Sequence, residues 1–138
     1  MNTRIADPGS ARLAGVDLHA LAAREGTPLY AYDALALDAR IDALRDGLHG
    51  RRARVCYAVK ANSNRALLAR IAAAGLGADI VSEGELRRAL AAGFRASDIV
   101  FSGVGKTRME IAAALEAGVG RFNAESREEL GLLDALAA

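Results

Sequence analysis

The stretch from Val55 to Asn64 constrains the fold of this chain more than any other. It begins as an apolar run with β-branched and aromatic residues, reaches Lys60, and then breaks into polar, turn-forming residues. An apolar run bounded by turn formers predicts a strand that is covered on both faces, as in a parallel sheet. The sequence therefore places a primary amine at the carboxyl end of a buried strand.

Two interpretations of Lys60 follow. A lysine at the end of a strand commonly extends its charged tip into water. If the amine is instead held in an apolar environment, the ammonium needs a partner, or its pKa falls and the neutral amine becomes nucleophilic. A neutral amine at this end of a parallel strand can form a Schiff base with a carbonyl compound. The rest of the chain favours this second interpretation.

The part of the chain before this strand is less regular. It contains several turn formers and one short helical segment, residues 18–25, which together predict an N-terminal arm. Residues 29–32 predict a short strand. Asp33 then has the position of an N-cap for a helix that ends near Gly47 or Gly50.

Strands and helices alternate after Lys60. Further strands are predicted at residues 78–81, 99–101 and 119–123, and each is followed by a helix. Three of the helices begin with the pattern of a capping box, a Ser or Thr followed three residues later by Glu. The cap residues are Ser82, Thr107 and Ser126.

This alternation predicts the topology of the sheet. Short crossovers of one hand make the strands parallel, so the sheet is either doubly wound or part of a barrel. In both architectures ligands bind at the carboxyl ends of the strands. The residues expected there are Lys60, Ser82, Ser102 to Lys106 and Asn123 to Ser126.

Asp79 is the second informative residue, because it lies in an apolar strand next to the one that carries Lys60. It is either an acid in the turn at the start of the strand, or an inward-pointing acid that pairs with Lys60 or orients its imine. Structural ion pairs are common enough that both interpretations stay open.

The loop from Ser102 to Thr107 has part of a phosphate-binding pattern. The full pattern needs a glycine five residues before Gly105, where Val100 stands instead. We therefore expect a flexible loop followed by a helix cap, with Lys106 on the surface.

Composition excludes several functions. The formal net charge is +1 and no basic tract is present, which argues against nucleic acid as the main partner. No apolar segment is long enough to span a membrane, and residues 1–14 lack the hydrophobic stretch of a secretory signal, so we expect a cytoplasmic protein. The single cysteine, Cys56, fits a reducing compartment and is expected to be a core thiol. Two histidines and one cysteine, far apart in sequence, predict no metal site.

Four motifs, taken in their order along the chain, resemble the barrel domain of the fold-type III pyridoxal-phosphate-dependent decarboxylases. The resemblance is closest to the members of this family that act on diaminopimelate. The resemblance runs from about Gly26 to the end of the chain. The motifs are Tyr57–Asn62, Gly77–Ser82 with Gly84–Leu86, Phe101–Thr107 and Phe122–Ser126.

The resemblance implies a fold class and a division into domains. The fold would be α/β, a partial (β/α)8 TIM barrel of the alanine racemase-like type, with about four β/α units and an N-terminal arm. Residues 1–33 would be this arm, with a short strand that belongs to a second, sheet domain of the full enzyme. Residues 34–138 would be the first half of the barrel that binds pyridoxal phosphate.

The resemblance also implies a site. Lys60 matches the lysine that holds pyridoxal 5'-phosphate as an internal aldimine, so it is expected to bind the cofactor and to act in catalysis. Asp79 matches an acid near that lysine, which is also expected to be catalytic. The substrate amine would displace Lys60, and loss of the α-carboxylate would leave a carbanion delocalised into the cofactor ring. With meso-diaminopimelate as the substrate, the product is L-lysine.

The groups that stack on the ring, hold the phosphate and complete a dimeric site in this family come from a later half that has no counterpart here. The chain is therefore expected to be the amino-terminal part of a homodimeric enzyme and to be inactive alone. Two alternatives remain. The substrate could be ornithine, arginine or another basic amino acid, or the chain could be a non-catalytic half-barrel that regulates or binds a partner.

Overall fold

The computed structural model describes residues 11–138 of the 138-residue chain. The chain divides into two compact units, one ending at His49 and one beginning at Gly50, and each is described by itself. The first ten residues of the predicted arm lie outside the described residues. No helix within residues 11–138 combines the length and the apolar character needed to cross a membrane.

Among the described residues, the first unit begins with a small antiparallel hairpin that the sequence did not predict. Strand β1 (Arg12–Leu13) pairs with β2 (Val16–Asp17) through a two-residue turn. Both turn residues, Ala14 and Gly15, have positive φ angles of 51° and 81°. This is the backbone that a tight hairpin turn requires, and only Gly15 adopts it without steric cost.

Two helices follow in the same unit. Helix α1 (Leu18–Glu25) agrees with the predicted bounds, and α2 (Ala34–Gly47) begins at the predicted cap, where the Asp33 carboxylate accepts hydrogen bonds from two backbone N–H groups. The strand predicted at residues 29–32 is absent. A strand needs a hydrogen-bonded neighbour, and no strand of the described residues pairs with this segment.

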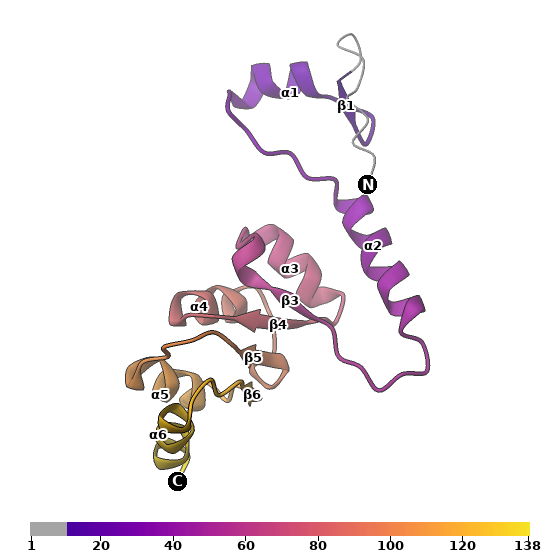
Figure 1. The fold of residues 1–138 in the computed structure, drawn as a ribbon. Coiled ribbons are helices and arrows are strands. Elements are labelled where there is room, and N and C mark those ends of the chain that lie inside the picture. Colours follow the sequence, from indigo (N-terminus) through magenta and orange to yellow (C-terminus); the bar gives the residue numbers. More distant parts are fainter. Residues whose placement is uncertain (1–10) are drawn as a thin grey trace. The chain divides into compact units, whose positions relative to one another are not determined.

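The second unit is a parallel sheet of alternating strands and helices, as predicted (Figure 1). The strands lie in the order β3-β4-β5-β6, and all three pairings are parallel. In chain order the strands and helices are β3 (Cys56–Ala58), α3 (Arg65–Ala73), β4 (Gly77–Ile80), α4 (Glu83–Ala91), β5 (Ile99–Phe101), α5 (Arg108–Glu116), β6 (Arg121–Phe122) and α6 (Arg127–Ala137). Two short 3-10 turns, η1 (Val59–Ala61) and η2 (Ala96–Asp98), complete the unit.

The two faces of this sheet differ in burial. Side chains alternate between the faces along each strand. One face carries the core residues Ala78, Ile80, Ile99 and Phe101, each no more than 1% exposed. We call the opposite face the open face. Apart from the buried Gly77, its residues are half-buried or exposed, and they are Cys56, Ala58, Asp79, Val100 and Arg121.

The strand before Lys60 is shorter than predicted. It ends at Ala58, and the chain enters the 3-10 turn η1 at Val59, which is fully buried. Lys60 therefore lies on a turn beyond the strand. The predicted strand 119–123 is likewise reduced to Arg121–Phe122. Val59 is buried although it lies outside the strand, and an apolar sequence pattern does not distinguish such a residue from one inside a strand.

The 3-10 turn η2 packs closely beneath the amino-terminal ends of two strands. A β-carbon at Gly77 would collide with the backbone oxygen of Asp98 and would lie 2.7 Å from the Cys56 sulfur. A β-carbon at Gly120 would collide with the Ser97 carbonyl. Glycine is therefore required at both positions for close approach of the backbone.

We predict that Gly77→Ala destabilises the chain by about 1–3 kcal/mol, because the added methyl group overpacks a site bounded by rigid backbone. The matched control is Gly131→Ala in α6, where a β-carbon meets nothing within 4 Å. This control should stabilise the chain by up to about 1 kcal/mol through helix propensity. Urea unfolding measures both free energies, and equal effects of the two substitutions would contradict the packing described here.

Candidate functional site

Lys60 is exposed, contrary to the expectation of a buried amine. It lies on η1, and this turn contacts β4 and α4. Within residues 11–138 the Lys60 ammonium has no hydrogen-bond or ion-pair partner. Lys60 thus follows the carboxyl end of β3 with its amine accessible from solvent.

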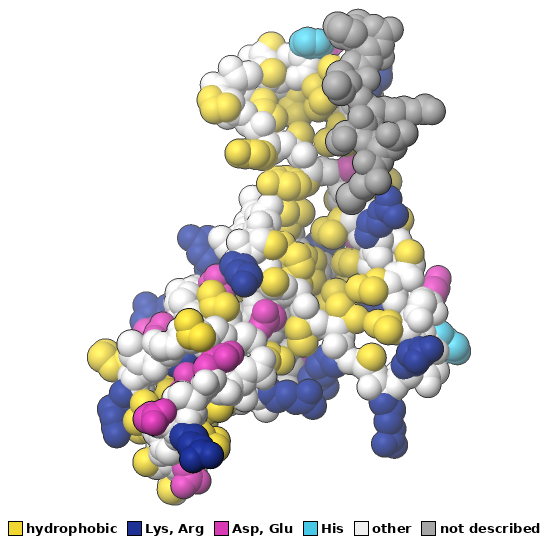
Figure 2. Space-filling view, viewed as in Figure 1, with side chains coloured by type: hydrophobic (Ala, Val, Ile, Leu, Met, Phe, Trp, Pro, Cys, Tyr) yellow, Lys and Arg dark blue, Asp and Glu magenta, His cyan; other side chains and the backbone are white. Residues whose placement is uncertain are grey.

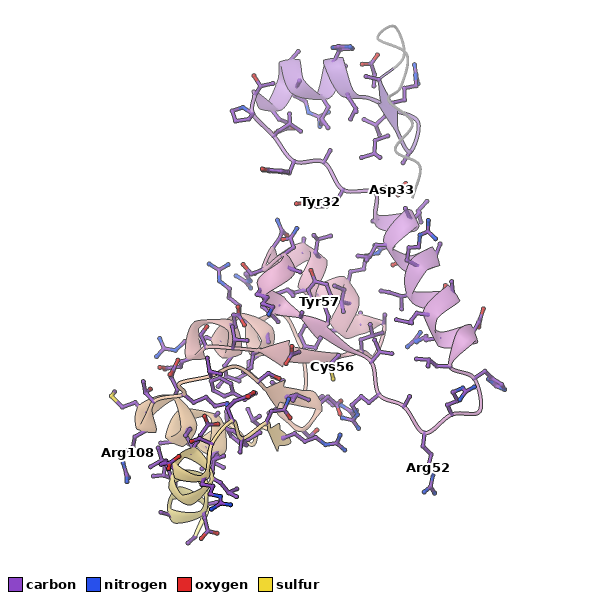
Figure 3. The ribbon with its side chains drawn as sticks, viewed as in Figure 1. Tyr32, Asp33, Arg52, Cys56, Tyr57 and Arg108 are labelled. Atoms are coloured by element: carbon purple, nitrogen blue, oxygen red, sulfur yellow. The ribbon has the colours of Figure 1, made fainter. Side chains whose placement is uncertain are left out.

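The turn after Lys60 is held by its own polar groups. The Tyr57 hydroxyl donates to the Asn62 carbonyl at 3.3 Å, and the Asn62 side chain accepts from the Asn64 N–H at 2.9 Å. The Asn64 side chain then caps α3. Cys56 and Tyr57 are consecutive residues of β3, and Figure 3 shows their side chains leaving the strand in different directions.

Asp79 lies inside β4 rather than in a turn. Its register partners are Ala58 on β3 and Val100 on β5. Asp79 is half-buried on the open face, and the described residues form no ion pair between Asp79 and Lys60. The carboxylate therefore stands beside the strand that precedes Lys60, without a direct bond to the amine.

Cys56 shares the open face with Asp79. Burial raises the pKa of the Cys56 thiol above its ordinary value, the positive charge of Arg54 opposes this rise, and the negative charge of Asp79 adds to it. The thiol is half-buried rather than a fully packed core group. The reactivity of the Cys56 thiol should therefore respond to the charge on Asp79.

Lys106 is buried, which corrects the expectation of a surface lysine on a flexible loop. Its side chain is 1% exposed. Its Nζ donates to the Gly103 carbonyl at 2.7 Å, to the Asn123 carbonyl at 2.7 Å and to Glu129 Oε1 at 2.6 Å, and it lies 5.8 Å from the centre of the Phe101 ring. An ammonium has three N–H donors, so these three acceptors satisfy it completely.

The sequence contains only two lysines, Lys60 and Lys106. Because the ammonium of Lys106 is fully occupied and buried, Lys60 carries the single accessible lysine amine of the chain. Counting lysines in the sequence would have revealed that only two candidates exist. The sequence pattern alone could not show that Glu129 pairs with Lys106 and makes its amine unavailable.

The three predicted capping boxes are formed to different extents. Thr107 and Glu110 make both reciprocal bonds of a capping box. Ser82 and Ser126 each accept from the backbone three residues later, but their partner glutamates bond elsewhere. Glu85 accepts from the Val81 N–H at 2.7 Å, and Glu129 pairs with Lys106.

Glu110 also joins two neighbouring helices. One of its oxygens accepts from Thr107, and the other accepts from the Glu83 N–H in the first turn of α4 at 3.4 Å. Hydrogen bonds from the Thr107 backbone and side chain lower the pKa of Glu110, and the bond from Glu83 adds to this effect. The beginnings of α4 and α5 are therefore tied together at the end of the sheet where Lys60 lies.

Comparison with known proteins places this geometry in a family. A family model described as pyridoxal-dependent decarboxylase, pyridoxal binding domain, matches residues 36–138. The chain is 54% identical over 117 residues to the diaminopimelate decarboxylase of Pseudomonas fluorescens. The matched segment covers 85% of this chain and 28% of that enzyme.

Solved structures show the same fold. A crystal structure from Aquifex aeolicus has a TM-score of 0.88 and 42% identity, covering 95% of this chain and 32% of that one. A Helicobacter pylori diaminopimelate decarboxylase in complex with L-lysine has a TM-score of 0.83 and 39% identity. The match covers 87% of this chain and 30% of that one. An Entamoeba histolytica ornithine decarboxylase is 22% identical with a TM-score of 0.77, which shows the fold alone.

These likenesses settle the architecture that the sequence pattern left open. The four parallel β/α units are part of a TIM barrel of the alanine racemase-like type, as the resemblance implied. The chain spans about 30% of the length of the relatives it matches.

We predict that Asp79→Asn accelerates the reaction of Cys56 with a disulfide reagent near neutral pH. Loss of the nearby negative charge lowers the pKa of the thiol and raises the thiolate fraction, by less than about tenfold. Asp134→Asn in α6, an exposed acid outside the strands that carry Cys56 and Asp79, is the matched control. An unchanged or slower rate in Asp79→Asn would contradict the placement of Asp79 on the same face of the sheet as Cys56.

Proposed function

Since the chain belongs to the pyridoxal-dependent decarboxylase family, through its pyridoxal-binding domain, we propose that it supplies the lysine-bearing part of an enzyme that decarboxylates an amino acid. The substrate we propose is meso-diaminopimelate, with L-lysine as the product. The name and 54% identity of the Pseudomonas fluorescens relative support this choice. The structurally similar Helicobacter pylori diaminopimelate decarboxylase was crystallised in complex with L-lysine, which supports it further.

The residues present fit pyridoxal phosphate. This cofactor binds covalently through its aldehyde, so it requires an amine that is accessible and uncommitted. Lys60 meets both conditions, and Lys106 meets neither. The observation that carries the proposal is this division between the two lysines of the chain.

Lys60 would hold the cofactor covalently through its Nζ atom. When bound, the cofactor supplies the electron sink that stabilises the negative charge left on the substrate by loss of carbon dioxide. The buried Val59 and the hydrogen-bonded turn at Asn62 fix the backbone on either side of Lys60. Lys60 is thus held by its backbone while its side chain stays free to react.

Asp79 would act as a fixed negative charge near the reacting centre. Its position inside β4 holds the carboxylate on the open face, one strand away from β3. A carboxylate there would stabilise positive charge on a bound cofactor. We propose this charge stabilisation, rather than a direct ion pair with Lys60, as the role of Asp79.

The assembly and location of the whole protein are proposals of the same kind. The family resemblance supports a homodimer in the cytoplasm. Sedimentation of the whole protein and cell fractionation would test the two proposals separately.

We predict that, of the two lysines in the purified chain, treatment with pyridoxal phosphate and borohydride modifies Lys60 and leaves Lys106 unmodified. The variants Lys60→Ala and Lys60→Arg should lose this modification, because neither offers an amine that condenses with the aldehyde. Lys60→Arg keeps the positive charge and so controls for simple attraction of the phosphate. Peptide mapping by mass spectrometry locates the label, and a label on Lys106 in the folded wild-type chain would overturn the proposal.

A further inference from the structure

Lys106 joins the two loops that follow β5 and β6. Its ammonium binds the carbonyl of Gly103 in the first loop and the carbonyl of Asn123 in the second, in addition to Glu129. The first loop contains two glycines with positive φ, Gly103 at 88° and Gly105 at 73°. Such a loop has many accessible backbone conformations, and Lys106 selects one of them.

Net stabilisation does not explain this buried pair well. Removing two charges from water offsets most of their attraction, and apolar replacements of buried ion pairs are often neutral or stabilising. What an apolar side chain could not do is bind two backbone carbonyls from different loops. The effect that only Lys106 provides is therefore to fix the backbone positions of Gly103 and Asn123.

The side chain of Asn123 is the group that this position controls. The parallel ladder continues beyond the strands, because Ser102 N–H donates to the Ile80 carbonyl at 2.8 Å and Asn123 N–H donates to the Phe101 carbonyl at 3.0 Å. Side-chain alternation along these extended strands then places Ser102 and Asn123 on the same face as Asp79 and Val100. Both residues thus extend the open face toward the carboxyl ends of the strands.

Ser102 and Asn123 form a polar pair on this face. The Asn123 amide nitrogen donates to the Ser102 hydroxyl oxygen at 3.0 Å. One amide hydrogen of Asn123 and the hydroxyl hydrogen of Ser102 remain to be donated, and Asn123 is exposed. The pair therefore offers two hydrogen-bond donors to a ligand at the end of the sheet where Lys60 lies.

We infer that Lys106 is a positioning residue for the cofactor site, and that it holds the Ser102–Asn123 pair where the pair donates hydrogen bonds to an oxygen atom of pyridoxal phosphate. This inference rests on the proposed function. It assigns Lys106 a role through the backbone of Asn123, and no direct contact with the cofactor.

The test is a titration of the chain with pyridoxal phosphate, with borohydride labelling at Lys60 as the readout of occupancy and urea unfolding without cofactor as the readout of stability. Asn123→Ala removes the exposed donor and should weaken binding roughly two- to tenfold, the effect of one hydrogen bond, with little change in stability. Lys106→Met should weaken binding by at least as much. Glu129→Gln is the matched control, because it removes the charge partner of Lys106 but keeps an oxygen acceptor for it.

We expect Glu129→Gln to bind the cofactor nearly as well as the wild-type chain, even if it unfolds at a lower urea concentration. A purely structural role for Lys106 instead predicts that cofactor binding weakens only as stability falls. Unchanged cofactor binding in Asn123→Ala would overturn the inference and leave the proposed function standing. Unchanged binding in a folded Lys106→Met variant would overturn it equally. If Lys106→Met does not fold, Asn123→Ala decides. Absence of labelling at Lys60 in the wild-type chain would refute the proposed function, and this inference with it.

Discussion

The parallel register of β3 to β6 is the constraint on which the rest of the second unit depends. Because Ala58 pairs with Asp79, and Asp79 with Val100, one row of side chains on each strand faces the buried core and the other row faces the open side. The buried row ends in Phe101, which stacks against Phe122 at a centroid separation of 6.0 Å. The open row contains charged and polar groups, and Figure 2 shows hydrophobic and charged side chains interspersed over the visible surface. The same hydrogen bonds that build the sheet thus gather polar chemistry on one of its faces.

The two lysines show how burial makes chemically identical amines differ in reactivity. Lys106 is surrounded by acceptors from three segments of the chain and acts as a fixed link between loops. Lys60 stands on a turn, without an acceptor among residues 11–138, and keeps its amine free. A primary amine is reactive only when it is both accessible and unpaired, so the burial of Lys106 is as informative about the site as the exposure of Lys60.

Sequence reasoning located most of the helices and strands because their signals are local. Caps such as Asp33, Thr107 and Ser126 lie within three residues of the groups that they bind. The errors arose where contacts between distant residues decide the outcome. Lys106 is buried by Glu129, which lies 23 positions further along the chain, and no local pattern predicts this pairing. The strand before Lys60 ends at Ala58, and the chain continues through the buried Val59 into a 3-10 turn, a boundary that no local pattern predicts.

The proposed site depends on one difference, that Lys60 offers a free amine and Lys106 does not. Competitive acetylation of the folded chain, followed by mass spectrometry of both lysine peptides, tests this difference without any cofactor. We predict that Lys60 reacts at least about tenfold faster than Lys106, because Lys106 reacts only when its loops open, and that the difference disappears in denaturant. Equal rates for the two lysines in the folded chain would contradict the division between them.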